Sequence, residues 1–362
     1  GLSIKGLFSY DFTLNDNKKF QKAYNLYTYN GVTGIYNGAT QQSPSTIRRE
    51  VYEYPTNLAQ LYLNYDHTFG AEHHVTGLLV YEQSTRSGDN FYAQRELSIP
   101  VDQLFAGNSL NQIGSESASQ ANAFEFKNSA YIGSFAYDYE TKYFGKFNFR
   151  YDGSSKFPVD KQWGFFPEGE IGWRISEESF WKDTKALSFV NSFKLRASYG
   201  LTGDDGAAAY QFVSGYTYPA SGSAAGQPPG AVFDGTFVNG VQSKGIPNPN
   251  ITWYTSKTLD VGVDAEAWNG LLGFTFDYFI RNRNGLLGTQ LGTLSDVVGA
   301  SLPQQNINAD RSQGFDFDVS HHNHIGEFAY NIKGTFGFTR TTIVTNVRSK
   351  ERSVGKECRY RW

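Results

Sequence analysis

Two groups of histidines are the side chains best suited to bind a metal ion. His73 and His74 are adjacent, and His321, His322 and His324 lie close together further along the chain. Zinc sites combine imidazole with thiolate or carboxylate ligands at short, regular spacings. Neither histidine group is joined by a cysteine or a carboxylate at such a spacing. We therefore predict that these histidines are solvated residues at or beside short turns, and we expect no metal and no cofactor.

Carboxylates that could act in pairs occur at three places. They are Glu177-Glu178, Asp204-Asp205, and Asp310 with Asp316 and Asp318. Asp316 and Asp318 alternate with Phe315 and Phe317, as expected for the polar face of a strand. The two glutamates follow Ser176, which suggests the N-cap and acidic first turn of a short helix. The sequence has no Gly-x-Ser-x-Gly, His-Glu-x-x-His or phosphate-binding glycine motif, so we predict that the chain is not an enzyme.

Apolar and polar residues largely alternate between residues 143 and 151. One face would hold Tyr143, Gly145, Phe147, Phe149 and Tyr151, and the other Phe144, Lys146, Asn148 and Arg150. A period of two predicts a strand with one mostly aromatic face and one largely polar face. The aromatic face would meet a second sheet or a helix in a soluble protein, and lipid in a membrane barrel.

Strand-like segments of this kind recur along the chain. The predicted strands cover residues 3–12, 56–69, 74–86, 128–140, 143–151, 163–175, 191–200, 254–267, 271–283, 310–321 and 327–343. Their connections alternate between long polar loops and short turns, one of which carries the hairpin signal Asn269-Gly270. In an up-and-down sheet, this order places every long loop at one end, as in outer-membrane barrels. A soluble sandwich or propeller would not require all long loops to lie at one end.

Composition supports the membrane alternative. The chain is 16% aromatic and has 38 glycines, yet its mean hydropathy is negative, as alternating strands produce. No run of 18 apolar residues encodes a transmembrane helix. We therefore predict an all-β fold: a fragment of an antiparallel transmembrane β-barrel of about eleven strands, not closed, with long extracellular loops and short periplasmic turns.

The two ends of the chain suggest a piece of a longer protein. The sequence lacks methionine altogether, and its one cysteine, Cys358, allows no internal disulfide. Residues 347–362 do not alternate and resemble a translated sequencing adapter, so we expect them to be non-native; a basic surface turn is the alternative. Without residues 347–362, which hold six basic and two acidic residues, the formal net charge of −3 becomes −7. This acidity argues against nucleic acid as a partner. The remaining domain is expected to cover 1–346.

Several motifs follow one another in a recognisable order. They are Arg150-Tyr-Asp-Gly-Ser-Ser-Lys-Phe157, Trp163-Gly-Phe-Phe-Pro167, Gly172-Trp-Arg174, Phe193-Lys-Leu-Arg-Ala-Ser-Tyr-Gly-Leu-Thr-Gly203 and Pro247-Asn-Pro-Asn-Ile-Thr-Trp253. This series resembles the barrel signature of the SusC/RagA family of TonB-dependent outer-membrane transporters of Bacteroidetes. After Trp253 the family usually has Glu-Lys, whereas this chain has Tyr254-Thr255.

The residues that carry the resemblance are expected to be structural. They are Asp152, Gly153, Ser154, Ser155, Phe157, Trp163, Gly164, Phe166, Pro167, Trp173, Arg174, Tyr199, Gly200, Gly203, Pro249 and Trp253. Residues 152–155 suggest a turn in which Gly153 takes a positive φ. Trp163, Trp173 and Tyr199 are suited to the membrane interface. Gly200 and Gly203 would begin a long loop, and we expect no ligand contact from these motifs.

The resemblance also implies a function. It implies a plugged barrel of about 22 strands in the outer membrane. Such a barrel would import glycans, oligosaccharides or peptides with force from the TonB complex, and a SusD-like surface lipoprotein would close its mouth. The resemblance further implies a plug that contacts TonB, which we expect to lie outside this sequence. Substrate contacts are expected from polar loops such as 24–30 as a group, without assignment to single residues. The alternatives are a TonB-dependent siderophore receptor and a passive porin or adhesin barrel.

Overall fold

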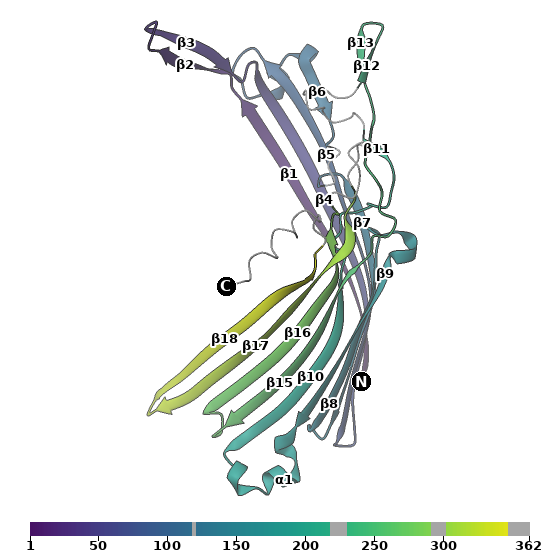
Figure 1. Ribbon diagram of the computed structural model, residues 1–362, viewed down its shortest axis with the longest axis vertical. Helices are drawn as coiled ribbons and strands as arrows, with labels where there is room; N and C mark the ends of the chain where they lie inside the picture. The colour runs from purple at the N-terminus through teal and green to yellow at the C-terminus, as the bar shows by residue number, and fades with distance from the viewer. Residues whose placement is uncertain (118–120, 218–229, 291–301, 347–362) are drawn as a thin grey trace, which may run out of the picture. The chain divides into compact units, whose positions relative to one another are not determined.

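The computed structural model describes residues 1–117, 121–217, 230–290 and 302–346 and consists almost wholly of strands (Figure 1). The chain forms two compact units. Unit 1 contains Gly1–Gly6, Leu61–Glu82 and the chain from Asn128 onward, and unit 2 contains Leu7–Gln60 and Gln83–Lys127. Several strands begin in one unit and end in the other.

The main sheet has twelve strands. In sheet order, eleven of them are β1 (Leu2–Gln21), β4 (Ser45–Phe69), β5 (His73–Leu97), β7 (Phe124–Tyr139), β8 (Tyr143–Ser154), β9 (Trp163–Arg174), β10 (Val190–Asp204), β15 (Tyr254–Ala267), β16 (Leu272–Gly288), β17 (Gln305–Ile325) and β18 (Phe328–Thr345). The twelfth, β6 (Gln112–Ser115), pairs with β5. The strands from β7 to β18 pair antiparallel. Because β1 and β18 end the order, the sheet is not closed, as predicted.

Each of the eleven predicted strands corresponds to one strand of this order, but several are longer than expected. β1 and β4 extend into the predicted loop 13–55, and β5 extends into the predicted loop 87–127. The alternation weakens there because polar residues occupy both faces. Three two-stranded sheets lie within the long connections. They are β2 (Tyr24–Asn30) with β3 (Ile35–Gln41), β11 (Tyr216–Thr217) with β14 (Gln242–Ser243), and β12 (Gly230–Phe233) with β13 (Thr236–Asn239).

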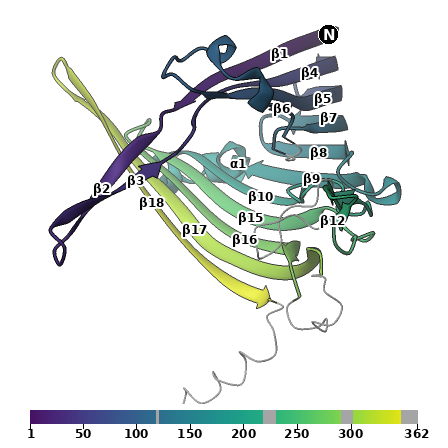
Figure 2. The same ribbon diagram turned by 90° about the horizontal axis from the view of Figure 1, so that it is seen from above.

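Short turns gather at one end of unit 1. Figure 1 shows the β15–β16 and β17–β18 turns and helix α1 (Ser179–Lys182) at the same end. Trp268, Asn269 and Gly270 all have positive φ, which confirms the Asn-Gly hairpin. Figure 2 shows β8 to β18 as one curved sheet.

Irregular connections contain short 3₁₀ turns. They are η1 (Leu104–Ala106), η2 (Ser109–Asn111), η3 (Val159–Lys161), η4 (Ile175–Glu177) and η5 (Lys185–Leu187). The predicted helix cap is wrong: Ser176 lies buried inside η4, and the residue before α1 is Glu178. No helix in the described ranges is long and apolar enough to cross a membrane.

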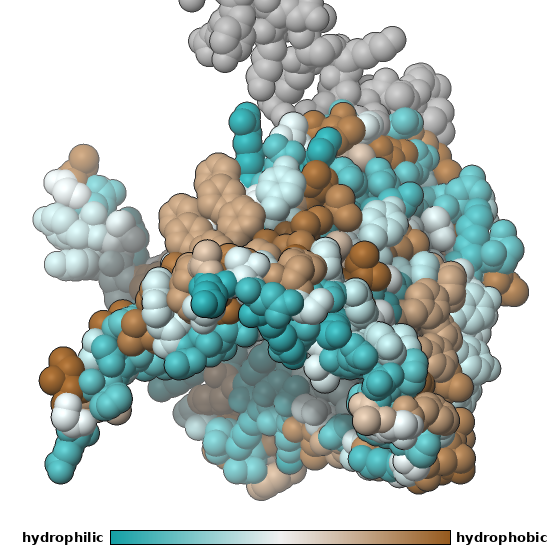
Figure 3. All heavy atoms as spheres, turned by 90° about the horizontal axis from the view of Figure 1, so that it is seen from below, coloured by the Kyte–Doolittle hydropathy of each residue, from teal (hydrophilic) through white to brown (hydrophobic). Residues whose placement is uncertain are grey.

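The outward aromatic face of the strands is exposed. Its side chains include Tyr131, Phe135, Tyr137, Tyr143, Phe147, Tyr151, Trp163, Phe165, Trp173, Tyr199, Phe274 and Tyr278. Figure 3 views the end that carries the turns and shows hydrophobic residues exposed there beside hydrophilic ones. A soluble sheet would cover so many rings, so their exposure supports contact with lipid.

Candidate functional site

The signature motifs meet in a buried cluster at the loop end of unit 1. Phe157 and Ile251 are fully buried and, with the buried Ala207, form its centre; Trp253 and Leu287 pack against it. We call this group the loop cluster. Its members come from the β8–β9 connection, the long β10–β15 connection and the end of β16. The cluster therefore ties two loops to the end of a strand.

Ring contacts place Trp253 at the centre of this group. Its indole lies 5.2 Å from the ring of Phe157 and 5.4 Å from the ring of Phe166, measured between centroids. The indole Nε1 donates to the carbonyl of Gln162 at 3.1 Å. Trp253 thus joins the β10–β15 connection to both ends of the β8–β9 loop.

Polar bonds reinforce the same junction. The hydroxyl of Ser154 donates to the carboxylate of Asp205 at 2.8 Å, and Lys156 pairs with that carboxylate at 3.3 Å. Lys161 donates to the carbonyl of Pro249 at 3.0 Å. Because Ser154 is almost completely buried, its bond to Asp205 satisfies a hydroxyl that water cannot reach.

Two asparagines bind backbone across loops. The amide of Asn306 accepts from the N–H of Thr252 at 3.0 Å and donates to the carbonyls of Thr252 and Gly285 at 2.9 and 2.8 Å. Asn248 donates to the carbonyl of Gln304 at 2.7 Å. The sequence did not single out Asn306, since it lies in a predicted loop and carries no motif, whereas the structure places it on β17. Asn248 belongs to the motif Pro247–Trp253, so the sequence did mark its position.

Signature glycines leave room for rings. A Cβ on Gly153 would lie 2.9 Å from the indole of Trp163, and one on Gly164 would lie 2.4 Å from the ring of Phe166. Gly153 belongs to β8 and has no positive φ, so the predicted turn at 152–155 is wrong. Its small size, rather than its backbone freedom, suits this position.

The remaining signature residues lie on the strands. The carboxylate of Asp152 pairs with Arg150, and Arg174 lies over the ring of Phe144. Pro167 lies just beyond the β9–β10 pairing, which ends at Glu168 and Gly200, so its missing N–H costs no bond to β10.

Exposed aromatics mark both ends of the outward face. Trp163 and Tyr199 are 40% and 56% exposed, and their position at the membrane interface stays a prediction. At the turn end, Trp173 Nε1 donates to the carboxylate of Glu178 at 3.0 Å, and the Tyr143 hydroxyl donates to the same carboxylate. Both hydrogen bonds lower the pKa of Glu178, and the bond from Tyr143 has the larger effect.

The opposite face of the strands is a polar wall. The guanidinium of Arg196 contacts Asp264 at 3.0 Å, Asp277 at 2.7 Å and Asp260 at 3.8 Å, thereby joining β10, β15 and β16. Gly262 lies beneath this network, where a Cβ would lie 2.3 Å from a carboxylate oxygen of Asp277. The wall therefore holds more carboxylates than cations at this point.

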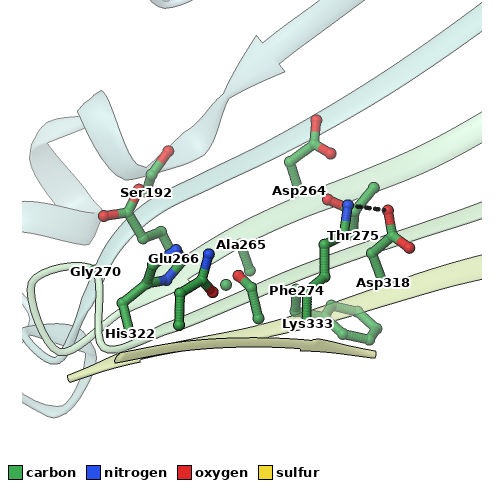
Figure 4. Close-up of a pocket in the computed structure, with 13 residues that line it drawn as sticks. Ser192, Asp264, Ala265, Glu266, Gly270, Phe274, Thr275, Asp318, His322 and Lys333 are labelled. Carbon is green, nitrogen blue, oxygen red and sulfur yellow. Dashed lines mark ion pairs between the residues drawn. The ribbon is translucent and has the colours of Figure 1, made fainter. Parts of the chain in front are cut away.

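A groove of about 580 Å³ lies on the same wall (Figure 4). Asp318 and Lys333 form an ion pair of 3.2 Å at one end, and Glu266 and His322 lie at the other. Asp318 therefore occupies the polar face, as predicted from its alternation with phenylalanine.

The histidines lie at the ends of strands next to short turns, in agreement with the predicted positions at or beside turns. His73 begins β5, and its Nδ1 lies 2.7 Å from the hydroxyl of Tyr137. His321 lies on β17, with Nε2 3.1 Å from the hydroxyl of Tyr330. In the parts of the chain that the structure describes, no three His, Cys, Asp or Glu side chains are placed to hold a metal ion.

An unclosed antiparallel sheet with an exposed aromatic face and a polar wall defines part of a membrane β-barrel. The chain belongs to the family described as "TonB dependent receptor-like, beta-barrel", whose profile matches residues 5–357. Proteins of this family lie in the outer membrane and are transporters, not enzymes. The predicted family and outer-membrane location are thereby confirmed.

Individual relatives agree with this assignment. TonB-dependent receptor P3 of Formosa agariphila is 27% identical over 92% of this chain and 32% of its own length. TonB-dependent receptor SusC of Bacteroides thetaiotaomicron is 31% identical over 53% of this chain and 18% of its own length. A solved RagAB peptide transporter shares the fold, with a TM-score of 0.74 and 18% identity over 95% of this chain and 35% of that chain. The chain thus spans about a third of P3 and of that RagAB chain.

Proposed function

We propose that the whole protein imports oligosaccharides or peptides across the outer membrane, with energy from the TonB complex and a SusD-like lipoprotein at the extracellular mouth. Membership of the TonB-dependent receptor family, with SusC among the relatives, carries this proposal. The polar wall supports it as well. A substrate that is rich in hydroxyl or amide groups can exchange its water for bonds to such a wall.

We further propose that the signature residues serve structure and do not contact substrate. Phe157, Phe166 and Trp253 pack on one another, and Ser154 is already bonded within the loop cluster. Loops that the loop cluster fixes in place would present a stable surface to a substrate and a lipoprotein. The proposed domain is residues 1–346; residues 347–362 lie outside the described residues, and their non-native origin stays a prediction.

Uptake by cells tests the importer. Cells that produce the full-length protein, with and without a co-produced SusD-like lipoprotein, would receive fluorescent oligosaccharides and peptides. We expect accumulation that stops when TonB is deleted or a protonophore is added. Uptake that continues in both treatments would indicate a passive porin. Uptake confined to ferric siderophores would indicate a siderophore receptor.

A further inference from the structure

Four rings stand in a row on one face of unit 2. Tyr52, Tyr54, Phe124 and Phe126 follow one another with centroid separations of 6.5, 6.2 and 4.8 Å. The planes of successive rings differ by only 8°, 17° and 15°. We call these four residues the aromatic row. All four side chains are partly exposed, so a ligand can reach them.

The backbone beneath the aromatic row is built to hold it. A Cβ on Gly88 would lie 2.5 Å from the ring of Phe124, so the absence of a side chain lets this ring lie on β5. The hydroxyl of Tyr54 donates to Asn122 at 3.3 Å. Asn90, which is 6% exposed, fixes Ser117 by two hydrogen bonds of 3.0 and 2.6 Å. The rings therefore have defined positions.

Positive charge flanks the aromatic row. Glu50 is 3% exposed and pairs with Lys19 at 2.9 Å and with Arg48, whose guanidinium lies 3.6 Å from the ring centroid of Tyr92. One carboxylate thus faces two cations. The hydrogen bond from Lys19 lowers the pKa of Glu50, so this carboxylate stays charged at neutral pH.

Arg86 adds a third cation, which no carboxylate of the described residues pairs with. Its guanidinium lies 5.6 Å from the ring centroid of Phe124, and its side chain is exposed. Within the described residues it forms no ion pair and no hydrogen bond through its side chain. A guanidinium held over an aromatic ring keeps its planar fork of donors free for an anion.

We propose that the aromatic row and Arg86 bind an oligosaccharide that carries carboxylate or sulfate groups. The proposal rests on the proposed import function and specifies its substrate class. The C–H faces of pyranose rings carry partial positive charge and pack on the negative faces of aromatic rings. The guanidinium of Arg86 binds the carboxylate or sulfate in a charge-assisted, bidentate manner.

Binding to the purified full-length receptor tests this site. Calorimetric titrations would use hexagalacturonate as the carboxylated probe, a chondroitin sulfate hexasaccharide as the sulfated one, maltohexaose as the neutral one and hexaglutamate as the acidic peptide. We expect one or both acidic saccharides to bind more tightly than maltohexaose and hexaglutamate. Raising the salt concentration should weaken this binding, because the charge contact is partly exposed.

Variants locate the binding. Arg86→Gln should weaken acidic saccharide binding by about tenfold, which corresponds to the loss of one charged hydrogen-bond pair. Phe124→Leu should weaken it as well. Lys18→Gln is the matched control, because Lys18 is an exposed lysine of the same unit that pairs with Asp102 and lines a different pocket with Arg49. It should leave the affinity unchanged.

Several results would overturn the proposal. Hexaglutamate that binds as tightly as the saccharides would make the site a peptide site. Equal affinity for maltohexaose, or unchanged affinity in a folded Arg86→Gln variant, would remove the role of charge. If TonB-dependent uptake of a neutral sugar or a peptide persists in that variant, the import function stands and only this substrate class fails.

Discussion

The ring of Phe166 occupies the space that a side chain on Gly203 would need. A Cβ added to Gly203 would lie 1.9 Å from Cζ of Phe166, closer than two carbon atoms can approach without displacement. The same ring meets Trp253 edge-on. The glycine on β10, the phenylalanine on β9 and the tryptophan before β15 therefore depend on one another.

Gly203→Ala should destabilise the loop cluster. The added methyl group must push Phe166 away from Trp253, and overpacking of this kind typically costs about 1–3 kcal/mol. Thermal unfolding and limited proteolysis of the full-length receptor would detect this as a lower melting temperature and faster cleavage in the β8–β9 and β10–β15 loops. Gly169→Ala on β9 is the control, because nothing lies within 4 Å of its added Cβ. Equal behaviour of the two variants would contradict the prediction.

Asn306→Ala should loosen the same loops by a different route. It removes the amide that binds the partly buried backbone of Thr252 and Gly285 by three hydrogen bonds, and each such bond contributes about 0.5–1.5 kcal/mol. Hydrogen exchange should become faster around residues 248–253 and 285–288. Asn331→Ala, which alters an exposed residue of β18, should leave this exchange as in the wild type. Unchanged protection in the Asn306 variant would mean that the packed rings alone hold the loops.

The strand pattern was readable from the sequence because alternation is a local property. Phe315 and Asp316, for example, fall on opposite faces of β17 whatever else surrounds them. The loop cluster was not readable, since it depends on Phe157 and Ile251, which are 94 positions apart in the printed sequence. The role of Gly153 likewise depends on a contact that the local sequence does not reveal. A glycine after aspartate suggests a turn, but here the position of Trp163 is the reason for its small size.

The outward tryptophans should contact lipid whereas Trp253 should not. Trp163 and Trp173 are exposed on the aromatic face, and Trp253 packs in the loop cluster. In single-tryptophan variants of the full-length receptor in bilayers, brominated lipids should quench the fluorescence of Trp163 and Trp173 strongly and that of Trp253 weakly. Strong quenching of all three residues would contradict this arrangement of faces.

The phenol of Tyr254 should ionise at unusually high pH. Tyr254 is the first residue of β15, at the loop end and outside the membrane-spanning part, and its hydroxyl donates to the carboxylate of Asp204. This hydrogen bond, together with burial, raises the pKa of Tyr254 to about 12 from its ordinary value of 10.0. Because the folded pKa is raised, the bond stabilises the fold fully below pH 10.0 and is lost as the pH rises towards about 12.

Ultraviolet difference titration can isolate this group among the 24 tyrosines. Subtracting the curve of Tyr254→Phe from that of the wild type should leave one transition near pH 12. Asp204→Asn should move that transition to lower pH, since an amide bears no negative charge to oppose formation of the phenolate. A difference transition at the ordinary pKa of tyrosine would show that the bond to Asp204 does not form in solution. A transition that Asp204→Asn leaves in place would assign the raised pKa to burial alone.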